Sequence, residues 1–114
     1  MKDIGGWIED CPFPIKACDK DANLVFINGK AAKNAEKLGG KSLVGKNILA
    51  FHKPQSQEKL KKLIAEGSCN VYSIEKKGKK SLVYQLPWIE GGKVCGMVEM
   101  TLPLPDDIPH YVRD

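Results

Sequence analysis

The sequence predicts an α+β domain in which a five-stranded antiparallel sheet carries helices on one face. Its apolar pattern has a period of two in two early stretches, a helical period in the middle, and a period of two again in three later stretches. Short turn sequences join the strands within each group, which favours antiparallel hairpins. The helices lie between the second and third strands and must bury their apolar stripes against the sheet.

The first two strands are predicted at residues 15–19 and 24–27. In residues 15–19, apolar and polar side chains alternate, as in a strand with one buried face. The polar segment 19–23 contains two aspartates and an asparagine, residues that accept turn geometry and bond their own backbone. Residues 24–27 are Leu-Val-Phe-Ile, a β-branched and aromatic run that suits the return strand.

Helical signals follow directly. Asn28 is a good N-cap, and apolar residues recur after it at helical spacing as far as Gly39-Gly40, a pair that suits a C-cap. Residues 47–51 predict one short helical turn. Residues 54–66 predict the longest helix, because proline suits its first turn, its leucines and isoleucine form one stripe, and Gly67 ends it.

Three strands are predicted in the second half, at residues 70–75, 81–86 and 94–102. The turn between the first two contains Lys77-Gly78-Lys79. The second turn begins at Pro87 and continues through the glycine pair before the last strand. Two hairpins in succession predict a meander.

The bulk properties indicate one globular domain without a nucleic-acid partner. The chain has 114 residues, enough for one core. Its formal net charge is +4, but Arg113 is the only arginine and the lysines are dispersed among acidic residues. No apolar run reaches the roughly 20 residues that span a bilayer. The start of the sequence has no apolar signal-peptide core, so we expect a cytoplasmic protein without membrane contact.

The four cysteines form no Cys-x-x-Cys pair, so zinc and thioredoxin-like sites lack their usual motif. Cys18 and Cys95 lie in apolar stretches, where a free cysteine acts as a small hydrophobe. The sequence also lacks a nucleophile elbow, a phosphate-binding loop and a paired-histidine metal motif. We therefore expect no metal site and no enzyme activity.

Several short motifs occur in a recognisable order. They are Pro14-Ile15 with Asp19-Lys20-Asp21, Phe26-Ile27-Asn28 with Ala31-Ala32, Val44-Gly45-Lys46, Gly78-Lys79, and Val94-Cys95-Gly96-Met97-Val98-Glu99. Together with the strand order, they make residues 12–102 resemble the PAS family. The resemblance divides the chain into a lead-in (1–13), a PAS domain (14–102) and a C-terminal tail (103–114). It implies a PAS-like sheet with helices on one face.

The resemblance also implies a sensory or dimerisation module in signal transduction. Ligands of the family include haem, flavins, small carboxylic acids and lipids, and some members have no ligand. A homodimer is expected, as is a signalling partner such as a kinase or a cyclase. A blue-light flavin subtype is not expected, because residues 47–52 lack the cysteine that this subtype has before the long helix.

The expected site is the space between the sheet and the helices, where a small ligand would lie. Its predicted binding residues are Ile15, Ile27, Asn28, Ile48, His52, Leu63, Tyr84 and Val98. For His52 the favoured interpretation is a residue that borders the long helix, and haem ligation is the alternative. Capping alone also explains Asn28, and sheet packing alone also explains Tyr84.

Two other hypotheses remain from the sequence. The first is a ligand-free interaction module with a filled core, which would dimerise through Trp7, Ile8, Val83 and Met97. The second is a small enzyme with a conical cavity, such as an isomerase. That enzyme would need a buried acid or base on the cavity face. Glu99 is the one candidate, and alternation along the strand is expected to turn it away from Val98 and from the cavity.

Overall fold

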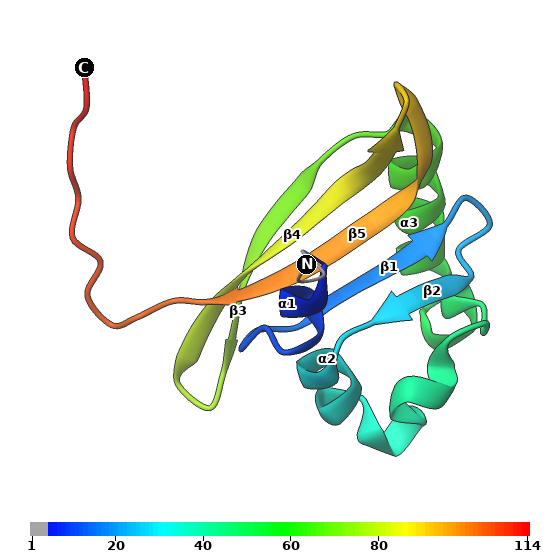
Figure 1. The fold of residues 1–114 in the computed structure, drawn as a ribbon, viewed down its shortest axis with the longest axis horizontal. Helices are drawn as coiled ribbons and strands as arrows, with labels where there is room; N and C mark the ends of the chain where they lie inside the picture. Colours follow the sequence, from blue (N-terminus) through cyan, green and yellow to red (C-terminus); the bar gives the residue numbers. More distant parts are fainter. Residues whose placement is uncertain (1–4) are drawn as a thin grey trace.

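A computed structural model describes residues 5–114, and its centre is one five-stranded antiparallel sheet. The strands stand side by side in the order β2-β1-β5-β4-β3, so the last strand lies beside the first (Figure 1). Every pairing is antiparallel. The α+β fold class predicted from the sequence is therefore confirmed. The strands are β1 (Ile15–Asp19), β2 (Leu24–Ile27), β3 (Asn70–Lys76), β4 (Lys79–Glu90) and β5 (Lys93–Pro103).

Helices connect β2 to β3, and one further helix precedes the sheet. They are α1 (Gly6–Glu9), α2 (Gly29–Asn34), η1 (Glu36–Leu38), η2 (Gly40–Leu43), η3 (Ile48–Phe51) and α3 (Pro54–Glu66). The predicted N-cap is confirmed, because the Asn28 side chain accepts a hydrogen bond from the Ala31 amide. Gly67 ends α3, as predicted, and it has the left-handed conformation. The helix predicted to reach Gly39 is shorter, since α2 ends at Asn34 and a 3-10 turn follows.

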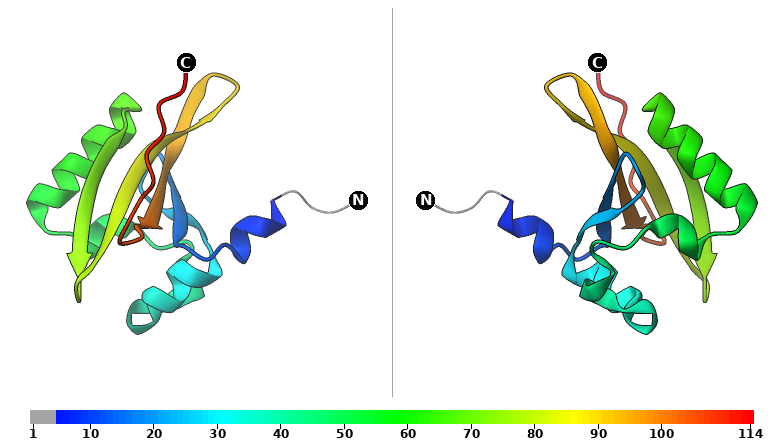
Figure 2. Two further views of the ribbon diagram at one scale, coloured as in Figure 1. Left: turned by 90° about the vertical axis from the view of Figure 1, so that its left-hand side faces the viewer. Right: turned by 90° about the vertical axis from the view of Figure 1, so that its right-hand side faces the viewer.

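The sheet has two unlike faces. Helix α3 lies on one side and α1 on the other (Figure 2). We call the α3 side the inner face and the α1 side the outer face. Leu60 and Ile64 of α3 pack against Cys18 and Met97, which places these two strand residues on the inner face. A second buried cluster joins β2 to α2 and η2, and consists of Leu24, Ile27, Ala31, Ala32 and Leu43.

One strand is longer than expected. A turn was predicted to begin at Pro87, but β4 continues to Glu90, and Pro87 pairs with Met97 of β5. Pairing between β4 and β3 begins at Gln85, so no third strand needs an N–H from Pro87. The proline therefore lies where its missing donor costs no ladder hydrogen bond.

The tail that follows β5 leaves the sheet (Figure 1). The backbone N–H of Leu104 still donates to the carbonyl of Lys80, and residues 105–114 are exposed. Within the described residues, no helix is long and apolar enough to cross a membrane.

Candidate functional site

A row of four polar side chains crosses the inner face, one from each of four adjacent strands. Lys16, Glu99, Gln85 and Asn70 are direct cross-strand partners in β1, β5, β4 and β3. Asn70 Nδ2 donates to Gln85 Oε1 at 2.8 Å, and Gln85 Nε2 donates to Glu99 Oε1 at 2.9 Å. Lys16 Nζ lies 3.3 Å from Glu99 Oε2. The register of the sheet thus assembles one continuous polar chain.

This row is the floor of an open cavity beneath α3, which we call the central hollow. Two overlapping parts of it have volumes of about 290 and 220 Å³. The exposed imidazole of His52 borders both parts, with its Nδ1 2.7 Å from the carbonyl oxygen of Ile48. The remaining lining includes Cys18, Leu24, Ile48, Ser56, Lys59, Leu60, Leu63, Tyr72 and Met97.

A second, apolar cavity opens beside the hollow, between β2 and the helices that follow it. We call it the apolar recess. Its volume is about 90 Å³, and its walls are mostly alanine, leucine and isoleucine side chains of β2, α2, η2 and η3. Lys16, Leu24, Ile48 and His52 border both cavities. The site therefore joins a polar compartment to a small apolar one.

Burial affects the acidity of Tyr72 on this face. The pKa of the Tyr72 hydroxyl is raised above its ordinary value of 10.0, first by burial and second by the negative charge of Glu99. The pKa of the Cys18 thiol is also raised, mainly by burial. Both groups are neutral near neutral pH, and Tyr72, which is 42% exposed, can offer a hydroxyl donor to a ligand.

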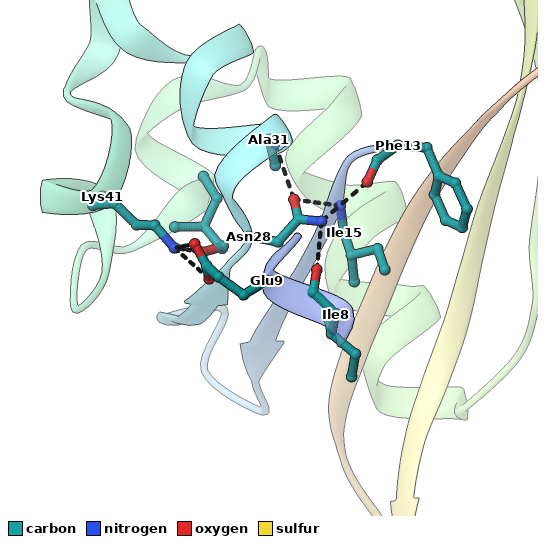
Figure 3. A network of polar contacts seen from close by, with 8 residues as sticks. Ile8, Glu9, Phe13, Ile15, Asn28, Ala31 and Lys41 are labelled. Carbon is teal, nitrogen blue, oxygen red and sulfur yellow. Dashed lines mark hydrogen bonds and ion pairs between the residues drawn. The ribbon is translucent and has the colours of Figure 1, made fainter. Parts of the chain in front are cut away.

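Asn28 is a structural residue at the edge of the site. Its side chain is completely buried, and Oδ1 accepts hydrogen bonds from the backbone N–H groups of Ile15 and Ala31 (Figure 3). Its Nδ2 donates to the carbonyls of Ile8 and Phe13. Backbone partners thus occupy both polar atoms of the amide, and the side chain lines neither cavity.

The predicted site residues divide between the two faces. Ile27, Ile48, His52 and Leu63 line the central hollow or the recess. Ile15, Tyr84 and Val98 do not, because they occupy the opposite register positions and belong to the outer face. The alternation was correct, but the more apolar set of residues was assigned to the wrong side of the sheet.

The same error affects Glu99 and the proposed dimer contacts. Glu99 shares the inner face with Met97, so the expectation that it points away from the cavity is wrong. Val83 and Met97 were expected at a dimer interface, but they are 4% and 5% exposed on the inner face. Trp7, in contrast, is 59% exposed on α1.

Sequence reasoning missed Lys16, Asn70, Tyr72, Gln85 and Glu99. A polar residue between two apolar residues of a strand ordinarily marks the solvent face. The pairing of the strands could have revealed them, because polar residues of four strands fall at matching register positions. That register depends on pairing between strands up to about 80 residues apart, which alternation within one strand does not reveal.

The surroundings of His52 do not fit a haem group. His52 lines the same part of the hollow as the Lys16–Glu99 pair. An apolar macrocycle placed there would remove this ion pair from water. Among residues 5–114, no group of three metal-ligating side chains is present.

Comparisons with known proteins agree with this architecture. No family model matches the sequence, and no curated protein matches it either. Among solved structures, a PAS domain of the Vibrio cholerae Aer2 receptor, described as a dual PAS-heme oxygen sensor, has a TM-score of 0.64 at 16% identity. That match covers 82% of this chain and 95% of the other.

Two further structures are similar over most of their length. A sensory box sensor histidine kinase from Vibrio cholerae has a TM-score of 0.63 at 16% identity, covering 90% of each chain. The PAS domain of an HTR-like protein from Haloarcula marismortui has a TM-score of 0.60 at 13% identity, covering 89% of this chain and 88% of that one. The strand order, the helices between β2 and β3, and these similarities establish that the chain has the PAS fold.

Proposed function

We propose that the protein is a sensory module that binds a small ligand in the central hollow and transmits the signal through protein contacts. The polar row carries this proposal. Lys16, Glu99 and Gln85 place charge and hydrogen-bonding capacity in a partly enclosed cavity, where polar groups need partners. Solved structures of this fold include an oxygen sensor and a sensor histidine kinase, which supports a role in signalling.

The sheet offers a route from the ligand to a partner. A ligand that forms a hydrogen bond with Glu99 would compete with Gln85 for the carboxylate. Gln85 is in turn hydrogen-bonded to Asn70 on the edge strand. The same two strands, β4 and β5, also present the side chains of the outer face. A shift between two arrangements of the row would therefore change the surface that a second copy, a kinase or a cyclase would contact.

A screen with a matched pair of variants tests ligand binding. The protein is heated with a library of small metabolites, and a binder raises its melting temperature. Ser56→Trp places an indole in the hollow, whereas Glu58→Trp places one on the exposed side of the same helix. We expect Ser56→Trp to abolish the shift and Glu58→Trp to retain it. A library without any stabilising compound would refute the proposal.

A specific observation also favours a second function, a ligand-free interaction module. The outer face of the two central strands is apolar and half-buried, with Leu82, Tyr84, Leu86, Trp88, Val98, Met100 and Leu102 in register. Contiguous apolar surface of this kind marks contact with another protein. The contact residues of such a module would be these outer-face side chains together with Trp7. Val83 and Met97 would not take part.

Sedimentation tests the second function. A homodimer formed through the outer face should dissociate on Tyr84→Glu, because the new carboxylate would lose its hydration in the interface. Lys62→Glu, an exposed change on α3, is the matched control and should leave the dimer intact. A wild-type protein that sediments as a monomer at high concentration would refute the homodimer.

We propose further that the module is not an enzyme and works in the cytoplasm. Both oxygens of Glu99 are already engaged, by Gln85 and by Lys16, which suits binding better than proton transfer. All four cysteines are free thiols, as is usual in a reducing compartment. A fractionation experiment with the tagged protein would check the location.

A further inference from the structure

We infer that the central hollow binds a small aliphatic amino acid: a zwitterion with a free ammonium group, a free carboxylate and a side chain of three or four carbons. The inference rests on the proposed ligand-binding function and adds the chemical class of the ligand. Three features carry it: the paired charges of Lys16 and Glu99, the apolar recess beside Lys16, and the ring nitrogen of His52 that is not bonded to Ile48.

The charges select a zwitterion. Lys16 Nζ and Glu99 Oε2 are 3.3 Å apart, so the site presents one positive and one negative group side by side. Lys16 has three N–H donors, and a carboxylate accepts up to about four hydrogen bonds, so each can take a further partner. A ligand with a single charge would pair with one of these two groups and would weaken the ion pair between that group and the other. A zwitterion offers an opposite charge to each and leaves no charge unpaired.

The recess sets the apolar part. It adjoins Lys16 and His52, so a ligand whose carboxylate reaches Lys16 can place a neighbouring side chain there. Its volume of about 90 Å³ equals roughly three times the 30 Å³ that one water occupies in the liquid. A side chain of three or four carbons fits this space. Its walls, which include Leu24, Ile27 and Leu43, would bury it away from water.

His52 supplies a further contact for the ammonium. The short distance from Nδ1 to the Ile48 carbonyl assigns the proton of the neutral ring to Nδ1, since the carbonyl can only accept. The other nitrogen, Nε2, is then an acceptor. The ligand's ammonium would donate to Glu99 and to this nitrogen, while its carboxylate accepts from Lys16.

Calorimetric titration of the full chain with four probes tests the inference. L-Leucine carries both charges and a four-carbon side chain. 3-Methylbutylamine lacks the carboxylate, 4-methylpentanoate lacks the ammonium, and glycine lacks the side chain. We expect leucine to bind at least about tenfold more tightly than each of the others, because each has lost one of the three contacts.

Variants assign each contact. Glu99→Gln should reduce the preference for leucine over 4-methylpentanoate, and Lys16→Met should reduce its preference over 3-methylbutylamine. Ala35→Leu fills the recess and should remove the preference for leucine over glycine, whereas Lys33→Met, an exposed change on α2, should change nothing. A variant that melts as the wild type does shows that the loss is local.

The outcomes separate this inference from the proposed function. If 3-methylbutylamine or 4-methylpentanoate binds as tightly as leucine, the zwitterion is refuted. If the metabolite screen finds a neutral or singly charged binder that Ser56→Trp blocks, the hollow is a ligand site but this class is wrong. If neither the probes nor the library bind, both conclusions are overturned.

Discussion

The amide oxygen of Asn28 accepts a hydrogen bond from the backbone N–H of Ile15, at 3.0 Å, across 13 residues of sequence. The same oxygen caps α2 through Ala31, and the amide nitrogen bonds the carbonyls of Ile8 and Phe13. One side chain therefore joins the lead-in, β1 and α2. A salt bridge between Lys41 and Glu9, at 2.6 Å, reinforces the same junction on its exposed side.

Asn28→Ala should destabilise the fold by about 3 kcal/mol or more, because it leaves several buried backbone groups without a partner, at about 1–3 kcal/mol each. Chemical denaturation measures the change. Asn34→Ala, on the exposed end of α2, is the control and should stay within about 0.5 kcal/mol of the wild type. A loss below about 1 kcal/mol for Asn28→Ala would mean that water replaces the amide.

Gly96 allows β5 to approach β1 closely. A Cβ at this position would overlap the carbonyl oxygen of Cys18 and would lie 2.9 Å from the Cα of Asp19. Both of these are backbone atoms, so no side chain can move aside. Gly96→Ala should therefore lower the free energy of unfolding by about 3 kcal/mol, in the range of overpacked cores.

The control for Gly96→Ala is Gly6→Ala in α1, where a Cβ meets nothing within 4 Å. Alanine also favours helix, so this variant should be as stable as the wild type or slightly more stable. Thermal melts of the two variants give the comparison. Equal melting temperatures would show that β1 and β5 can separate at Gly96 without cost.

Local patterns were sufficient to predict most of the fold. The Asn28 cap, the Gly67 stop and the turn at Lys77 and Gly78 are each determined by nearby residues. Lys77 and Gly78 both have positive φ, as a two-residue hairpin turn requires. The length of β4 was underestimated. The strand can include Pro87 because β3 begins to pair with β4 only at Gln85, and the sequence of β4 alone does not show where that pairing begins.

The face of the sheet that the helices cover could not be predicted from alternation. Both sets of residues in β5 contain apolar side chains, and the more apolar set, with Val98 and Met100, faces outward. The rule that the apolar face is the covered face failed because the inner face holds a polar row in an open hollow. Several residues predicted for the site line the hollow or the recess, whereas the polar residues of the floor were not predicted.

The acidity of Tyr72 should depend on Glu99. Burial and the Glu99 charge both raise its pKa, so Glu99→Gln should lower it while leaving it above the ordinary value. Ultraviolet absorbance of tyrosinate follows the titration, and Tyr72→Phe identifies its step. An unchanged step in Glu99→Gln would show that burial alone causes the shift.

The same shift has a consequence for stability. The folded pKa of Tyr72 is raised, so the unfolded chain loses the proton first, near pH 10. The stabilising effect of the neutral hydroxyl is complete below that pH and is lost as the pH rises through the folded value. Stability should thus fall more steeply above pH 10 in the wild type than in Tyr72→Phe. Tyr111→Phe, in the exposed tail, is the control.

The purified protein should show no strong absorption band at the blue edge of the visible spectrum. The Lys16–Glu99 pair beside His52 opposes a buried macrocycle. An absorption spectrum, with and without added haem, measures this directly. A strong band that disappears in His52→Ala would instead make His52 an axial ligand and would show that the hollow accommodates a macrocycle.

The polar row should contribute little to stability. The Lys16 side chain is 46% exposed, and an ion pair that reaches water typically contributes only about 0–1 kcal/mol. Lys16→Met combined with Glu99→Met should therefore unfold within about 1 kcal/mol of the wild type, or at higher denaturant. Glu99→Met alone should be less stable than the double variant, since it leaves Lys16 without its partner.

The double variant also separates function from folding. If it is as stable as the wild type but no longer gives a thermal shift with L-leucine, the row serves binding, because the fold does not need it. Denaturation curves and calorimetry on the same sample provide both readings. A double variant that loses more than about 2 kcal/mol would assign the row to the architecture of the sheet, with β1, β5, β4 and β3 held in register by Lys16, Glu99, Gln85 and Asn70.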